Sequence, residues 1–124
     1  MRMSINEYQD AAMRTANTDY SAIMERIESG GEPLLRLLNG ALGLSGEGGE
    51  VADIVKKHIF QGHEMDVIHI CKELGDCCWY IAVAAQAIGY PLEQVTQTNV
   101  DKLRRRYPDG FDAEKSLNRK DGDV

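Results

Sequence analysis

The chain has 124 residues, of which 43% are apolar, and its 20 acidic against 14 basic side chains give a formal net charge of −6. A chain of this length usually forms one domain, so we expect a single domain over residues 1–124, with residues 113–124 as a flexible tail. The acidic balance argues against a protein that coats nucleic acid or binds an anionic membrane.

The apolar segments and the cysteines indicate a cytoplasmic protein. The longest apolar stretch, 77–88, is interrupted by Gln86 and is too short to span a bilayer, and we recognise no signal peptide. Cys71, Cys77 and Cys78 lack the spacing of zinc ligands, and their odd number does not suggest a disulfide framework. We interpret them as small core residues in a reducing compartment.

The first two predicted elements are short helices. Residues 4–15 carry apolar positions at helical spacing, and Ser4 with Glu7 three residues later has the pattern of a capping box. A second helical piece over 20–27 is expected to end at the glycine pair 30–31.

The next predicted helix, 34–60, contains five glycines between positions 40 and 49, and Pro33 suits its first turn. Each glycine lowers helix stability by about 0.5–1 kcal/mol relative to alanine. The apolar spacing resumes in phase after the glycines, so we predict one helix rather than a break near Ser45. The small residues would then let another helix or a ligand approach the backbone closely.

Two further helices complete the pattern. After a connection at 61–63, apolar spacing predicts a helix over 65–88 that ends at Gly89. Pro91 is expected in the first turn of a last long helix that runs to residue 106. The predicted fold class is therefore all-α, with a four-helix bundle-like core.

Two acidic pairs, Glu47-x-x-Glu50 and Glu73-x-x-Asp76, lie on successive predicted helices. This spacing places both members of a pair on one helix face, and the intervening chain is long enough for about three turns out and three turns back. Four converging carboxylates would repel one another strongly. A hard cation such as Mg²⁺ removes that repulsion and also binds phosphates, so we predict Mg²⁺-dependent chemistry on a phosphate ester or anhydride.

A second polar stripe lies on the last long helix. Asn99, Lys102 and Arg106 share one face, where they could hold phosphate oxygens. The alternative is a solvated basic helix end, which the helix dipole favours. Tyr80, one turn after Asp76, could stack on a base or pack in the core.

Three segments, GLSGEGGEVADIVKK, KELGDCCWYIA and NVDKLRRRYPDGF, together resemble the MazG-like nucleotide pyrophosphohydrolases of the all-α NTP pyrophosphatase superfamily. The opening NEYQDAAMRTA is similar to the first helix of small members, so the resemblance covers residues 4–111. It implies four-helix modules assembled as a dimer or dimer of dimers. It also implies hydrolysis of a nucleoside triphosphate, NTP or dNTP, between the α- and β-phosphates to the monophosphate and pyrophosphate.

The same resemblance implies roles for individual residues. Mg²⁺, with Mn²⁺ as a possible substitute, would be held by Glu47, Glu50, Glu73 and Asp76. Metal chemistry places Glu47 and Glu50 at the catalytic step, with Glu50 as our candidate for the group that takes the proton of the attacking water. The residues expected to bind the substrate are Lys57, Tyr80, Asn99, Lys102 and Arg106.

Three alternatives stay open. A di-iron carboxylate bundle needs E-x-x-H on two helices, and only Asp66-x-x-His69 comes near that pattern. A non-catalytic regulatory protein that binds nucleotide or metal, and a phosphoribosyl-ATP pyrophosphohydrolase, would keep the same acids. The sequence does not determine the base or sugar preference of the enzyme, or whether it forms a homodimer or a homotetramer.

Overall fold

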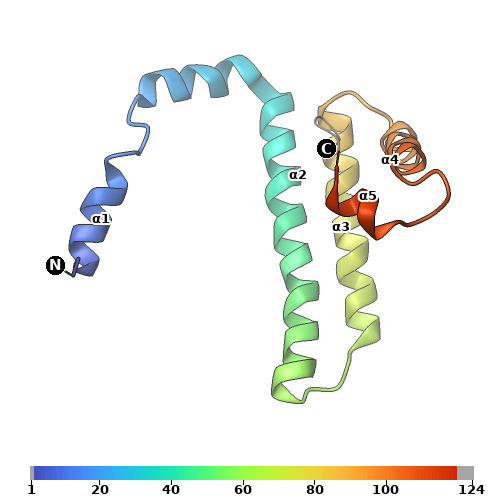
Figure 1. The fold of residues 1–124 in the computed structure, drawn as a ribbon. Helices are drawn as coiled ribbons and strands as arrows, with labels where there is room; N and C mark the ends of the chain where they lie inside the picture. Colours follow the sequence, from blue (N-terminus) through green and yellow to red (C-terminus); the bar gives the residue numbers. More distant parts are fainter. Residues whose placement is uncertain (1, 120–124) are drawn as a thin grey trace. The chain divides into compact units, whose positions relative to one another are not determined.

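A computed structural model describes residues 2–119 of the chain and contains, within them, helices and no strand (Figure 1). The all-α prediction is therefore confirmed. The helices in chain order are α1 (Ile5–Met13), α2 (Tyr20–Gln61), α3 (Val67–Ala87), α4 (Leu92–Arg106) and α5 (Ala113–Leu117). The chain divides into two compact units, Met1–Leu35 and Arg36–Val124, with the boundary inside α2. That both belong to a single domain stays a prediction.

The first unit contains α1 and the start of α2. The backbone N–H of Glu7 donates to Ser4 Oγ at 3.2 Å and the backbone N–H of Ser4 donates to Glu7 Oε2 at 2.6 Å, so the predicted capping box is present. α2 begins at Tyr20, as predicted, and its helical backbone is interrupted at Gly31, where φ is +60°. Only glycine adopts such a φ at little cost. The glycine pair thus separates two helical pieces, and Pro33 follows at the start of the second.

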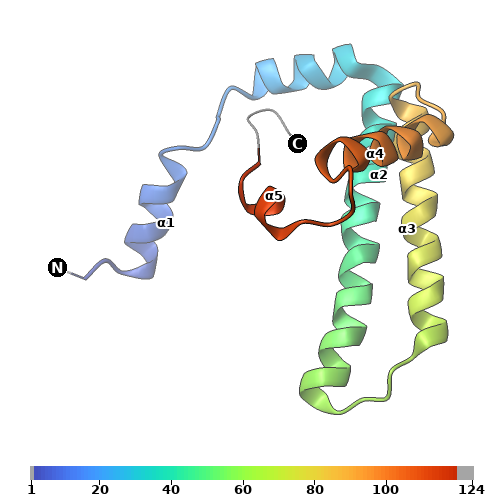
Figure 2. The same ribbon diagram turned by 45° about the vertical axis from the view of Figure 1, so that its right-hand side comes forward.

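The second unit is built on an antiparallel hairpin formed by the rest of α2 and by α3 (Figures 1 and 2). α2 continues through the glycine-rich stretch to Gln61, which confirms the prediction of one helix across Ser45. α3 starts at Val67, two residues later than predicted, because Asp66 caps it by accepting the backbone N–H of His69 at 2.9 Å. It ends before Gly89, as predicted.

Gly40 and Gly43 allow α2 and α3 to approach closely. A Cβ at Gly40 would lie 3.0 Å from the Cβ of Ala84 and 3.1 Å from the carbonyl oxygen of Tyr80. A Cβ at Gly43 would collide with the Tyr80 ring. Side chains at these two positions would push the helices apart, so the predicted close approach of another helix to the glycine-rich stretch is confirmed here.

The chain after α3 forms two more helices. α4 packs on α3 (Figure 2), and Pro91 precedes its first turn as the N-cap instead of standing within it, with ψ at 142°. Part of the predicted tail is helical, because Asp112 Oδ1 accepts the backbone N–H of Glu114 at 2.9 Å and starts α5. Residues 120–124 of the predicted tail lie outside the described residues.

The described chain buries few of its apolar residues. Among residues 2–119, Ala85 is the one apolar side chain in the buried class, whereas Leu42 and Trp79 are 65% and 58% exposed. The cysteines were expected in a core, but Cys71 and Cys78 are exposed, because α3 has a neighbouring helix on only part of its circumference. No helix in the described range has the length and apolar character needed to cross a bilayer.

The contact at Gly43 gives a first prediction. Gly43→Ala should lower the free energy of unfolding by about 1–3 kcal/mol, because the new methyl group must displace the Tyr80 ring. Gly48→Ala is the matched control: its methyl group meets open space, so it should raise stability by about 0.5–1 kcal/mol. Urea denaturation of both variants measures the difference. Equal effects at the two positions would contradict the close approach.

Candidate metal centre

The hairpin brings three carboxylates together. Glu47 on α2 and Glu73 and Asp76 on α3 each place one oxygen within 4.8 Å of the other two. Glu47 and Glu73 are half-buried and Asp76 is exposed. Because Glu47 follows Gly43 by one turn of α2, the close approach at Gly43 also brings this carboxylate within reach of α3.

Glu50, the fourth acid of the predicted set, lies outside this group and is exposed. A step of three residues places Glu50 about 60° around α2 from Glu47. The charge of Glu50 still acts on the group, because it contributes to raising the pKa of Glu47. Its predicted role as a metal ligand stays a prediction.

The three carboxylates interact strongly in the absence of a cation. A hydrogen bond with Glu73 is the main cause that raises the pKa of Glu47 above its ordinary value of 4.5. Loss of hydration and the negative charges of Glu73 and Asp76 raise it further. Glu47 therefore retains a proton to a higher pH than an isolated glutamate and donates it to Glu73, which lowers the repulsion within the group.

The group fits a hard divalent cation. Its donors are carboxylate oxygens, which suit Mg²⁺ and Mn²⁺, and it contains no thiolate or imidazole of the kind that softer metals prefer. The near match to a di-iron motif has another role in the structure, since Asp66 Oδ1 accepts the backbone N–H of His69 as the cap of α3. This leaves the di-iron alternative without its candidate motif.

Two contacts around the acids were missed by the sequence reasoning. His69 Nε2 lies 2.7 Å from Glu73 Oε1, one turn away on α3. Asp53 forms ion pairs with Lys56 at 3.0 Å and Lys57 at 2.6 Å. Both contacts join residues three or four positions apart on one helix, and that spacing is the signal by which they could have been found.

The substrate-binding candidates are distributed over three helices. The Lys57 ammonium is paired with Asp53, which raises the pKa of Lys57 and keeps it positively charged. Tyr80 packs against Gly43 and meets Trp79 edge to face, with ring centroids 5.0 Å apart. On α4, Asn99 is exposed, and Lys102 and Arg106 are half-buried. The acidic group itself is formed by α2 and α3, so the predicted contribution of α4 stays a prediction.

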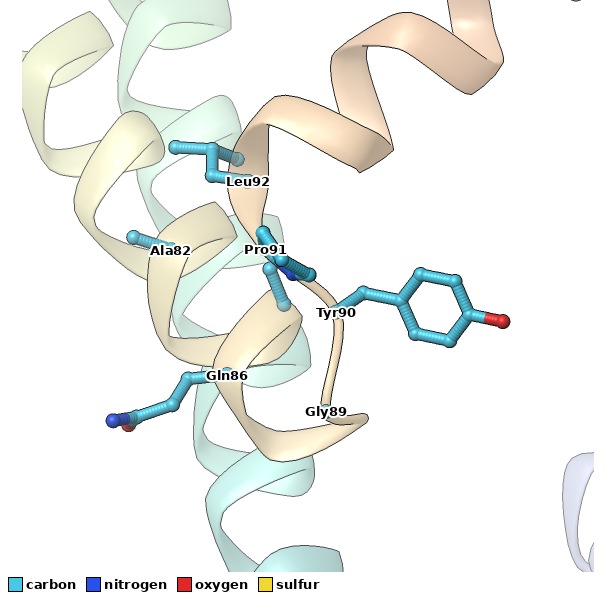
Figure 3. Close-up of a pocket in the computed structure, with 7 residues that line it drawn as sticks. Ala82, Gln86, Gly89, Tyr90, Pro91 and Leu92 are labelled. Carbon is cyan, nitrogen blue, oxygen red and sulfur yellow. The ribbon is translucent and has the colours of Figure 1, made fainter.

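A separate depression of about 350 Å³ lies where α3 ends and α4 begins. Figure 3 shows Ala82 and Gln86 on α3, Pro91 and Leu92 at the start of α4, and the Tyr90 ring projecting away from both helices. The seven residues that line it carry no ionisable group except the Tyr90 phenol. It therefore lacks the charges needed to hold a triphosphate or a cation.

The comparison with known families agrees with this geometry. The MazG nucleotide pyrophosphohydrolase domain matches residues 38–111. The chain belongs to the MazG family. The matched range contains all the acids of the centre and every substrate-binding candidate. The Gene 37 protein of Mycobacterium phage L5 is 35% identical over 111 residues, a match that covers 84% of this chain and 89% of that protein. No solved structure matches the chain.

The raised pKa of Glu47 gives a second prediction, about stability in this MazG domain. The folded state binds the Glu47 proton more tightly than the unfolded state, so in the absence of metal this group destabilises the fold increasingly as pH rises through its raised pKa. Glu47→Gln removes that effect. The melting temperature of Glu47→Gln minus that of the wild type, measured in EDTA, should increase as pH rises above the ordinary glutamate pKa of 4.5.

A cation should reverse that order. Added Mg²⁺ binds the folded wild type and raises its melting temperature by mass action, whereas Glu47→Gln lacks one of the three charges and should gain less. A difference in melting temperature that does not change with pH would show that Glu47 holds no shared proton.

Proposed function

We propose that this MazG-family protein hydrolyses a nucleoside triphosphate, NTP or dNTP, between its α- and β-phosphates, with a divalent cation held by Glu47, Glu73 and Asp76. The observation that supports it best is the group of three carboxylate oxygens within 4.8 Å, formed by two helices of the matched domain. Three carboxylates this close repel one another as they ionise, which lowers the stability of the fold unless a cation binds between them. A divalent cation would offset this repulsion and could also bind the phosphates of a substrate.

When bound, Mg²⁺ or Mn²⁺ would neutralise phosphate oxygens and favour ionisation of the attacking water. Glu50 is our candidate for the group that takes the proton of that water, because it is exposed and its charge acts on Glu47 without its being a member of the three grouped acids. The oxygen of the water forms a bond to the α-phosphorus, the bond from that phosphorus to the bridging oxygen breaks, and pyrophosphate leaves. Glu47 must lose its proton before it can act as a ligand, so metal affinity should rise with pH.

The remaining candidates would meet the substrate outside the cation. Lys102 and Asn99 on α4 are proposed to hold phosphate oxygens, with Arg106 in the last turn of the same helix. Tyr80 is proposed to contact the base, and its position is fixed by the ring packing on Gly43 and Trp79. Lys57 is the weakest candidate, because Asp53 already neutralises its charge.

A substrate panel tests the proposal. Purified protein with Mg²⁺ is offered the common NTPs and dNTPs, oxidised and deaminated analogues, and phosphoribosyl-ATP, and released pyrophosphate and monophosphate are measured. In water enriched in heavy oxygen the label should enter the monophosphate, since attack is at the α-phosphorus. Glu73→Gln and Asp76→Asn should lower kcat/KM by at least about 100-fold, a loss of roughly 2.7 kcal/mol of transition-state stabilisation.

Glu64→Gln provides the matched control, because Glu64 is an exposed glutamate between α2 and α3 and outside the acidic group. It should keep wild-type kinetics. Nucleotide binding without hydrolysis of any member of the panel would favour the regulatory alternative, and turnover of phosphoribosyl-ATP alone would favour the sister enzyme. Full activity of both Glu73→Gln and Asp76→Asn would show that the metal site has been placed wrongly.

We also propose that the hairpin is completed by a second copy of the chain, in a homodimer or homotetramer. On α2, Leu38 and Leu42 lie on the side opposite Gly40 and are 51% and 65% exposed. Gly49 lies on the same side, and a Cβ there would meet open space. An apolar stripe with a small residue next to it suits the close packing of another helix. Because the described chain buries few apolar residues, burial between subunits would also add stability.

Sedimentation velocity at micromolar concentration tests this assembly. The wild type should sediment as a dimer or larger species, and Leu42→Glu should raise the dissociation constant at least about tenfold, a change of 1.4 kcal/mol. Leu117→Glu on α5, where the native leucine is 84% exposed, serves as the matched control and should sediment like the wild type. A folded wild-type monomer would contradict the proposal.

A further inference from the structure

His69 lies next to the acidic group but is not a member of it. It precedes Glu73 by one turn of α3, and its Nε2 lies 2.7 Å from Glu73 Oε1. An ionised carboxylate can only accept, so the ring nitrogen carries the hydrogen and donates it. The Glu73 side chain is 14% exposed and that of His69 is 47% exposed, so the bond joins a surface side chain to a more enclosed one.

Glu73 has more than one interaction to satisfy. One is the hydrogen bond that raises the pKa of Glu47 on α2, and the other is the His69 ring on its own helix. A glutamate side chain has three rotatable torsions and populates many conformers in the absence of contacts. The hydrogen bond from His69 to Oε1 reduces the number of conformers open to the Glu73 carboxylate.

The backbone of His69 is also held. Its N–H donates to Asp66 Oδ1 at 2.9 Å in the first turn of α3, so the residue that orients Glu73 is anchored at both its backbone and its ring. Hydrogen bonds to the free oxygen of a ligating carboxylate fix its orientation, and their removal typically costs about 10–100-fold in metal affinity. An isolated surface pair of this spacing, by contrast, contributes little to stability and nothing to a neighbouring site.

We infer that His69 is a positioning residue of the cation site, which acts by holding the carboxylate of Glu73 and touches neither cation nor substrate. The inference rests on the proposed function in so far as it requires a cation to bind at Glu47, Glu73 and Asp76. A carboxylate has two oxygens, so Glu73 can bind a cation through one while His69 donates to the other.

Three variants test it: His69→Ala, His69→Gln and, as the matched control, His63→Ala in the turn between the hairpin helices. The probes are Mn²⁺ by electron paramagnetic resonance and Mg²⁺ by calorimetry, both without nucleotide, together with the melting temperature in EDTA. His69→Ala should weaken the affinity for both cations by about 10–100-fold. His69→Gln should restore it to within about threefold, because the amide nitrogen can donate across one turn. His63→Ala should bind like the wild type.

The outcomes separate this inference from the function on which it rests. If the wild type binds the cations and His69→Ala binds them with the same affinity, the role of His69 is overturned and the proposed function stands. Failure of the wild type to bind either cation overturns the proposed site, and the role of His69 with it. Equal losses in the alanine and glutamine variants, accompanied by lower melting temperatures in EDTA, would show that the ring supports the fold and does not orient Glu73.

Discussion

The close approach of α2 and α3 at Gly40 and Gly43 is the constraint on which the rest of the second unit depends. Packed helices usually lie about 8–10 Å apart, according to the side chains between them. Here the contact is made by a ring and a backbone carbonyl of Tyr80 against bare α2 backbone. One turn further along α2, the helices are close enough for the Glu47 carboxylate to lie within 4.8 Å of those of Glu73 and Asp76.

This arrangement makes the helix and the site depend on one another. Glycine weakens a helix in isolation, and helices in proteins gain most of their stability from packing. The same glycines that permit the packing therefore also make it necessary. The three carboxylates add an opposing force, because a hydrogen bond and like charges shift the Glu47 proton equilibrium in the metal-free state. A cation bound at these carboxylates, as proposed, would remove this opposing force.

Local signals were sufficient for most of the fold. The Ser4–Glu7 capping box, the break at Gly31 and the end of α3 before Gly89 each depend on residues within one or two turns. The unbroken course of α2 followed from apolar spacing that keeps its phase. The meeting of Glu47 with the acids of α3 could be predicted because one hairpin of known helical rise fixes the height at which they face each other.

The rest of the site depends on directions that spacing alone does not give. Residues three apart share a face only broadly, so Glu50 could not be separated from Glu47 before the rotation of α2 about its axis was known. Asp66 looked like part of a metal motif, but its side chain is used to start α3. Whether the α4 candidates lie near the acids depends on the path of the whole helix, which residue spacing does not give. His69 precedes Glu73 by four residues, a spacing that permits contact, but the hydrogen bond between them is known only from the side-chain positions in the structure.

The cap at Asp66 has a consequence for how this sequence can vary in length. α3 has its own start signal at Asp66, and His69 and Glu73 follow at fixed steps along the helix. Residues added between positions 61 and 66 would lengthen the turn without changing the phase of the helix that follows. A single residue added between His69 and Glu73 would rotate every later side chain of α3 by about 100°. A change in the length of this turn therefore leaves the spacing of His69, Glu73 and Asp76 along α3 intact, whereas a change in the number of residues after Asp66 alters which of them face Glu47.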